Sequence, residues 1–132
     1  MRLQGRMTNI LIVDDDPLQA SLMMSVLGRH FGNLRRVTDA AEALCLIEQP
    51  EFADDLCLVI TGHHMPGIGG PAFVAELHLR LPTLPVLVLG NAGEVAEDYT
   101  GKWLRFLPKP VSGEEMLALA SEMLTAHPCE AL

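Results

Sequence analysis

Four places along the chain could carry or frame a chemical site, because each follows or ends an apolar segment. They are the pair Asp14 and Asp15, Gly62, Gly90 and Lys109. The acids and the lysine offer electrostatic chemistry, since a lysine brought beside two carboxylates can pair with either and relieve their repulsion. The glycines offer no functional group. The pattern therefore predicts a charged site in which two positions lack a side chain.

Other interpretations of the same residues stay open. His63 and His64 suggest a metal site, but adjacent residues of an extended segment point apart and rarely hold one ion. Gly62 alone could be a turn glycine, since strand ends favour this residue. Asp14 and Asp15 could be solvated acids or structural partners of Lys109.

The apolar segments that precede these positions are continuous, which is typical of strands covered on both faces of a parallel sheet. Strands are predicted at 10–13, 34–37, 56–61, 86–89 and 103–107. Helices are predicted at 17–31, 38–49, 71–81 and 112–125, with Asp16, either Thr38 or Asp39, and Ser112 as N-terminal caps. Such alternation indicates an α/β fold with right-handed crossovers. Sites in these sheets lie beyond the carboxyl ends of the strands, where the four places fall.

Composition limits the classes of function. The chain has 132 residues and a formal net charge of -8, so a phosphate backbone would repel it and we expect no nucleic-acid partner. No apolar run approaches the roughly 20 residues that span a bilayer. The first residues, MRLQGR, are not followed by the apolar stretch of a secretory signal, which favours a cytoplasmic location.

Three motifs in register resemble the receiver domain of response regulators in two-component signalling. They are ILIVDDDP, HMPGIGG and FLPKP, and the resemblance covers residues 8–126, with 1–7 as an N-terminal extension and 127–132 as a tail. The resemblance implies a flavodoxin-like (βα)5 fold, a doubly wound parallel sheet of strand order 2-1-3-4-5. It also implies a bacterial origin and a phosphoryl group taken from a histidine kinase onto an aspartate at the end of the third strand.

The family motifs assign roles to particular residues of this chain. Asp14 and Asp15 match the acidic pair that holds Mg²⁺, and Lys109 matches the lysine of the fifth-strand loop. Pro110 matches the proline that follows this lysine, and Phe106 matches the aromatic switch position.

The two positions that touch the phosphoryl group depart from the family pattern. Counting back three residues from Met65 places the acceptor at Gly62, and counting five from Pro85 places the Ser or Thr position at Gly90. Glycine has no nucleophile, so phosphorylation at the usual position is excluded by this alignment. Two carboxylates and one lysine leave about one net negative charge, so we expect weak Mg²⁺ binding, millimolar or worse, measurable through Trp103 fluorescence.

The segment from Gly90 to Lys109 is shorter than the family pattern by roughly one helical turn. We therefore expect the fourth helix of the fold to be short or remodelled. In the family this helix belongs to the face that binds partners. Tyr99 and Trp103 lie near this segment and are candidate interface residues.

These observations predict an atypical receiver, a pseudo-receiver that acts by protein-protein interaction and is not an enzyme. A histidine kinase, a phosphotransfer protein or another regulator is the expected partner, and a homodimer is a further option. The alternative is a working phosphoacceptor in which Asp15, Asp16 or His63 takes the phosphoryl group with Mg²⁺. A third option is a small-molecule sensor whose ligand fills the space left at Gly62 and Gly90.

Overall fold

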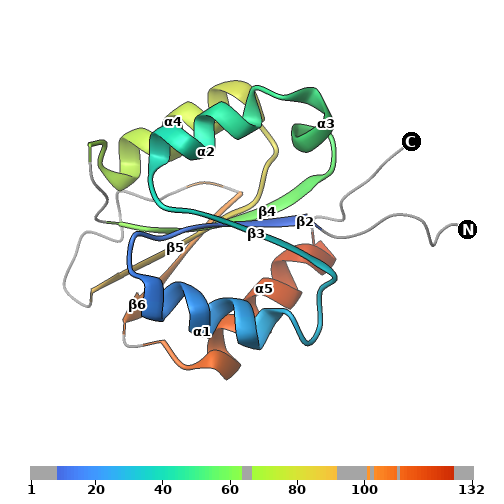
Figure 1. Ribbon diagram of the computed structural model, residues 1–132, viewed down its shortest axis with the longest axis vertical. Helices are drawn as coiled ribbons and strands as arrows, with labels where there is room; N and C mark the ends of the chain where they lie inside the picture. Colours follow the sequence, from blue (N-terminus) through green and yellow to red (C-terminus); the bar gives the residue numbers. More distant parts are fainter. Residues whose placement is uncertain (1–8, 64–66, 92–100, 102, 110, 127–132) are drawn as a thin grey trace, which may run out of the picture.

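A computed structural model of the chain describes residues 9–63, 67–91, 101, 103–109 and 111–126, and five parallel strands form its centre (Figure 1). The strands are β2 (Asn9–Val13), β3 (Asn33–Val37), β4 (Leu56–Gly62), β5 (Val86–Asn91) and β6 (Leu104–Lys109). They lie in the order β3-β2-β4-β5-β6, which is 2-1-3-4-5 in chain order. The predicted flavodoxin-like sheet is confirmed.

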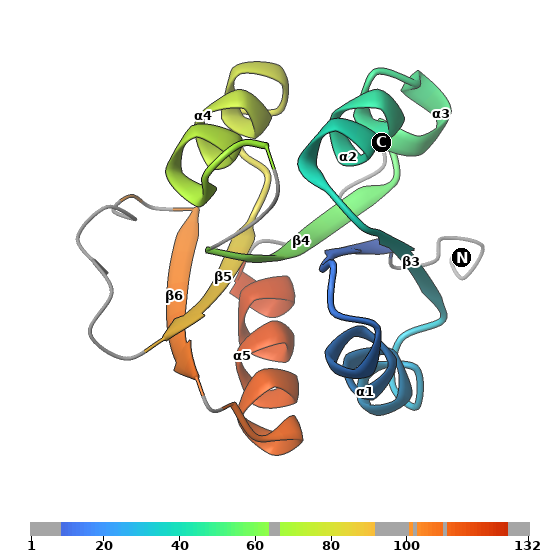
Figure 2. The ribbon, with the colours of Figure 1, turned by 60° about the vertical axis from the view of Figure 1, so that its left-hand side comes forward.

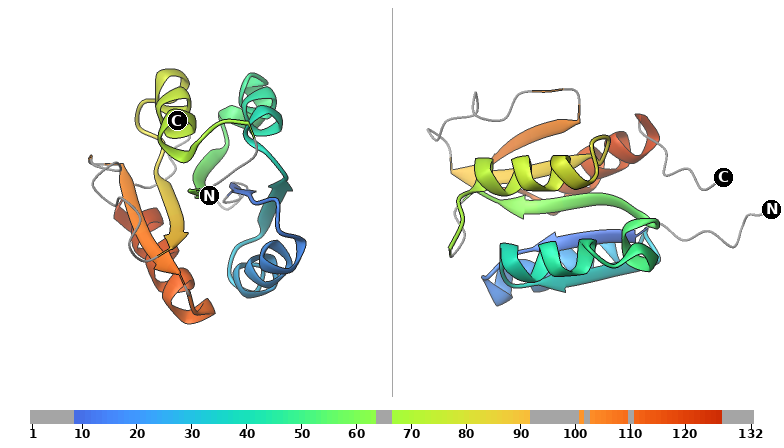
Figure 3. Two further views of the ribbon diagram at one scale, coloured as in Figure 1. Left: turned by 90° about the vertical axis from the view of Figure 1, so that its left-hand side faces the viewer. Right: turned by 90° about the horizontal axis from the view of Figure 1, so that it is seen from above.

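Helices cover both faces of this sheet. They are α1 (Pro17–Leu27), α2 (Ala40–Ile47), α3 (Pro50–Ala53), α4 (Gly70–Arg80) and α5 (Gly113–Ala126). Helices α1 and α5 lie side by side on one face, and α2 and α4 lie on the other (Figure 2). The same layers are visible in the left view of Figure 3, with α2 and α4 above the strands and α1 and α5 below them. None of the described helices is long and apolar enough to cross a membrane.

Each face of the sheet has its own hydrophobic core, because successive strand residues point to opposite sides. Leu11, Val13 and Val59 pack in the core beneath α2 and α4. Ile12 and Ile60 pack in the second core, beneath α1 and α5. This alternation decides which face each residue at the carboxyl edge occupies.

Side-chain caps begin three of the helices as the sequence predicts. The carboxylate of Asp16 accepts hydrogen bonds from the N–H groups of Leu18 and Gln19 at 3.0 and 3.5 Å, and Asp39 accepts from the N–H of Glu42 at 2.8 Å. Ser112 and Glu115 form the reciprocal capping box at the start of α5.

Some element boundaries differ from the predicted ones. Helix α1 ends at Leu27 and not at Phe31. Its last helical bond runs from the N–H of Gly28 to the carbonyl of Met24, after which the N–H groups of His30 and Phe31 both bond to the carbonyl of Leu27. Helix α3 was not predicted, and β6 runs two residues further than expected, to Lys109. The expected short fourth helix falls mostly on residues 92–100, outside the described part of the chain.

Candidate functional site

The strand register brings the predicted site residues to one edge of the sheet. Val13 pairs with Thr61 across β2 and β4, so Asp14 lies level with Gly62. Gly62 in turn pairs with Leu89 of β5, and Asn91 pairs with Lys109. The acid, the first glycine and the lysine therefore converge from three strand ends, as sequence spacing predicts.

Asp14 is the most constrained residue of this edge. It is only 8% exposed, and its two carboxylate oxygens accept hydrogen bonds from the N–H of Asp16 and the amide of Gln19, both at 2.9 Å. Its backbone carbonyl accepts two bonds from the guanidinium of Arg36, at 3.1 and 2.9 Å. Burial raises the pKa of Asp14, and the hydrogen bond from Asp16 together with the charge of Lys109 opposes that rise.

The neighbouring acids are placed differently. Asp15 is exposed to solvent, and Asp16 is exposed while its carboxylate caps α1. Lys109 is half-buried, and among the described residues it forms no ion pair within 4.0 Å of a carboxylate. The direct pairing that the sequence allows between Lys109 and Asp14 or Asp15 is therefore not formed. Lys109 acts on Asp14 at longer range.

The two glycines lie on different faces of the sheet. Gly62 follows the alternation of Ile60 toward α1 and α5, the side of the second core. Gly90 is buried and follows Val88 toward the opposite face, which Phe106 also occupies. Thr61, beside Gly62, is 1% exposed and belongs to that opposite face, so it does not face Asp14 across the edge.

His63 is the one residue of the pair His63 and His64 that the structure describes. The backbone N–H of His63 bonds to the carbonyl of Leu89 at 2.9 Å, which extends the pairing of β4 and β5 by one residue. His64 and Pro110 lie outside the described residues. Within the described part of the chain, no three metal-ligating side chains form a cluster.

Trp103 lies at the other end of the sheet from the acids. Its carbonyl accepts a hydrogen bond from the N–H of Val86, the first residue of β5. Six residues of extended strand separate it from Lys109, or about 20 Å. Its fluorescence is therefore a poor reporter of the acidic edge, contrary to the sequence-based expectation. Trp103 is half-buried, and Tyr99 lies outside the described residues.

Sequence reasoning missed the residues that hold Asp14 in place. Gln19 lies in the first turn of α1, five positions after Asp14, and Arg36 lies near the end of the neighbouring strand β3. The pairing of Ile12 with Arg36 in parallel register explains why this guanidinium reaches the Asp14 carbonyl. A polar residue within the first turn after an acidic strand end was the available signal.

Comparison with known proteins agrees with the motifs. The family model for the response regulator receiver domain matches residues 10–121. The chain is 30% identical over 125 residues to the two-component response regulator ORR24 of Oryza sativa, covering 92% of this chain and 20% of that protein. It is 26% identical to the transcriptional regulatory protein AruR of Pseudomonas aeruginosa, covering 87% of this chain and 48% of that protein.

A solved structure shows the same fold. The signal receiver domain of an HD domain-containing protein from Pseudomonas fluorescens Pf-5 superimposes with a TM-score of 0.82 and 23% identity. The alignment covers 95% of this chain and all of that one. The chain thus spans less than half the length of the two curated relatives and nearly all of this isolated domain. It belongs to the response regulator receiver domain family.

Proposed function

We propose that this chain is a phosphorylation-independent receiver, a pseudo-receiver that signals by binding other proteins. The observation that carries the proposal is Gly62 at the end of β4, level with Asp14, where the family resemblance expects the acceptor aspartate. No carboxylate can be phosphorylated there. We infer that the receiver unit is 8–126, with flanking segments 1–7 and 127–132, and that it has no enzymatic activity of its own.

The second glycine supports a loss of the phosphorylation switch. In the family, a Ser or Thr hydroxyl at the Gly90 position couples the phosphoryl group to the aromatic residue that Phe106 matches. Gly90 and Phe106 share one face of the sheet, and Phe106 packs against the core beneath α2 and α4. Without the hydroxyl, Phe106 would keep one fixed rotamer. Two exchanging Phe106 ring environments that respond to a ligand would contradict this idea.

The described residues fit Mg²⁺ poorly. Mg²⁺ prefers oxygen ligands in octahedral geometry, and carboxylates supply most of its protein contacts. Both oxygens of Asp14 already accept N–H donors at 2.9 Å, Asp15 is exposed, and Gly62 supplies no third carboxylate. We therefore expect weak binding, millimolar or worse, to be followed by amide NMR shifts near Asp14. Saturation at micromolar Mg²⁺ would contradict it.

The proposed partners are those of the family: a histidine kinase, a phosphotransfer protein or another regulator, with a second copy of the chain as a further option. ORR24 is named a two-component response regulator and AruR a transcriptional regulatory protein, and both are longer than this chain. A bacterial, cytoplasmic setting is part of the proposal. No nucleic-acid or membrane contact is proposed, in keeping with the net charge of -8.

The test is intact mass spectrometry after incubation with acetyl phosphate and Mg²⁺. The double variant Gly62→Asp, Gly90→Thr is the matched control, because it restores both missing groups in the same fold. We expect the double variant to gain one phosphoryl group while the native chain stays unmodified. A phosphoryl adduct on the native chain would refute the proposal.

The competing function is a displaced phosphoacceptor, and exposure favours Asp15 for that role. Among the described contacts, the Asp15 carboxylate accepts no hydrogen bond, whereas the Asp16 carboxylate is occupied by the cap of α1. His63 is half-buried and directly follows Gly62, the last residue of β4. If the native chain is modified, Asp15→Asn should abolish the adduct, and Asp16→Asn and His63→Gln should retain it.

A further inference from the structure

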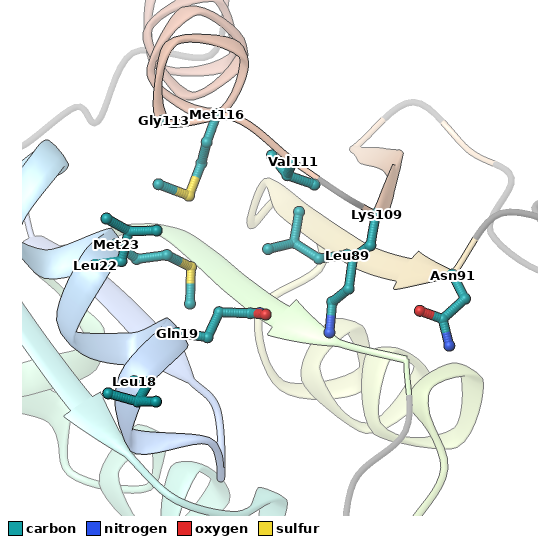
Figure 4. A pocket seen from close by; sticks show the side chains of 10 residues that line it. All are labelled: Leu18, Gln19, Leu22, Met23, Leu89, Asn91, Lys109, Val111, Gly113 and Met116. Atoms are coloured by element: carbon teal, nitrogen blue, oxygen red, sulfur yellow. The ribbon is translucent and has the colours of Figure 1, made fainter.

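A pocket of about 560 Å³ opens between α1, the ends of β5 and β6, and the start of α5 (Figure 4). Its volume falls within the range of about 300–1,000 Å³ typical of small-molecule sites. It is lined by Leu18, Gln19, Leu22, Met23, Leu89, Asn91, Lys109, Val111, Gly113 and Met116. None of the four places singled out in the sequence, apart from Lys109, contributes to it.

The apolar side chains and the polar side chains line different parts of the pocket. Leucine, methionine and valine side chains from α1, β5 and the start of α5 form an apolar wall. Lys109 is the one charged residue among the ten that line the pocket, and its amine extends toward the same end as the Gln19 side chain (Figure 4). This arrangement suits a ligand with an apolar body and one anionic end.

The nearby aspartate acts on this cation only at longer range and forms no direct ion pair with it. Asp14 is not among the lining residues, and its oxygens are directed to the N–H of Asp16 and the amide of Gln19. Lys109 forms no ion pair within 4.0 Å with a carboxylate of the described residues. Its amine therefore retains the capacity to bind an anion at the pocket.

The mouth of the pocket exposes apolar surface that a ligand would cover. Leu18 is 82% exposed and Leu22 is 57% exposed, although both line the pocket. Met23 and Met116 lie deeper and are almost fully buried. An aliphatic chain lying along α1 would contact the leucines and remove them from water, which is the favourable term of such binding.

We propose that this pocket binds a small organic carboxylate with an aliphatic body, held by Lys109 at one end and by Leu18 and Leu22 along its length. The proposal goes beyond the proposed function and is tested separately from it, because Gly62 does not line the pocket and octanoate binding needs no phosphoryl group. A ligand bound there would lie beside the edge of the sheet that carries Asp14, and its binding could act as a signal.

The probe is sodium octanoate, titrated into the isotope-labelled native chain and followed by amide NMR shifts. We expect saturable shifts in α1 and around Lys109 and Val111, with a dissociation constant on the order of 1 mM for a ligand of this size. 1-Octanol has the same body without the charge, and octylammonium reverses the charge. We expect octanol to bind about tenfold more weakly, and octylammonium to bind more weakly still.

Matched variants test the two halves of the pocket. Lys109→Met should remove the preference for octanoate over octanol, whereas Arg105→Met, four residues earlier on β6 and outside the pocket, should retain it. Leu18→Ser should weaken octanoate binding about five- to tenfold. Leu79→Ser changes a leucine on α4 that is 75% exposed, comparable with Leu18, and should leave binding unchanged.

Several results would overturn the proposal. Absence of saturable shifts in the folded native chain would do so, and would be the expected outcome if the pocket receives only side chains of a partner protein. Equal affinity for octanol, or unchanged affinity in Lys109→Met, would reject the carboxylate. Phosphorylation of the native chain by acetyl phosphate would reject the proposed function and leave the octanoate results standing.

Discussion

Replacing Asp14 by asparagine should stabilise the protein at neutral pH. The side chain is 8% exposed, and burial raises the pKa of its carboxyl group. Ionised Asp14 is thus less favourable in the folded chain than in the unfolded one. Asparagine removes the charge and keeps the contacts: its oxygen accepts from the N–H of Asp16, and its amide donates to a flipped Gln19 side chain.

The size of the gain follows from linkage between pKa and stability. Each unit by which the folded state raises a pKa corresponds to about 1.4 kcal/mol. The hydrogen bond from Asp16 and the charge of Lys109 offset part of the effect of burial, so we expect a gain at the low end of the roughly 0.5–3 kcal/mol by which single substitutions typically change stability. For a domain of this size each kcal/mol raises Tm by about 3 to 6 °C.

The direction of the pKa shift of Asp14 determines how its contribution to folding stability changes with pH. The unfolded group titrates near 3.8 and the folded one above it, so the folded state binds more protons between these values. Native stability attributable to Asp14 therefore falls as pH rises through this window. The advantage of Asp14→Asn should be complete at about pH 7 and should vanish as pH falls below the unfolded value.

Urea unfolding followed by circular dichroism at several pH values measures this difference. Asp15→Asn is the matched control, since it removes the same charge from an exposed neighbour and should change stability by less than about 0.5 kcal/mol. An Asp14→Asn variant that is less stable than the native chain at neutral pH would refute the reasoning. An equal gain in Asp15→Asn would assign the effect to net charge instead of burial.

Three further substitutions test contacts around the same edge. Asp16→Ala removes the cap of α1 and should lower the free energy of unfolding by about 1 kcal/mol in urea; an unchanged value would show that the cap contributes nothing. Arg36→Met leaves the Asp14 carbonyl without its two guanidinium donors and should cost about 1–3 kcal/mol by the same measurement, and a neutral result would mean that water replaces them. Gly113→Ala would bring a Cβ to 2.9 Å from a methyl group of Val26, so thermal unfolding should show a loss of stability of about 1–3 kcal/mol. Adding Val26→Ala should recover most of that loss, and losses that simply add would exclude the clash.

The fold could be predicted because its signals are local. Continuous apolar segments such as 10–13 and 86–89 are long enough to indicate buried strands, and the caps at Asp16, Asp39 and Ser112 mark where helices begin. The end of α1 was less predictable. Apolar spacing continues to Phe31, yet the helix ends at Leu27. The end could not be predicted, because a pattern of hydrophobic residues does not show where the backbone hydrogen bonds of a helix stop.

The site was predictable only where it depends on strand ends. Sequence spacing brings Asp14, Gly62 and Lys109 to one edge, because parallel strands end together. The contacts of each side chain depend on the twist of the sheet and the placement of α1, which spacing does not encode. For this reason Gln19 and Arg36 were missed, and the pairing that the sequence allows between Lys109 and Asp14 or Asp15 is not formed.

The position of Lys109 links the Gly62 position to the pocket. A lysine held in an ion pair with a carboxylate would have its charge compensated, but at this edge the Gly62 position supplies no carboxylate and both Asp14 oxygens are bonded to N–H donors. The amine is left half-buried beside an apolar pocket with exposed leucines at its mouth. A carboxylate placed at this position should therefore compete with the ligand for Lys109. Gly62→Asp should weaken octanoate binding even without phosphorylation, because the new carboxylate would draw Lys109 toward β4. Unchanged octanoate affinity in Gly62→Asp would show that the acceptor position and the pocket are independent.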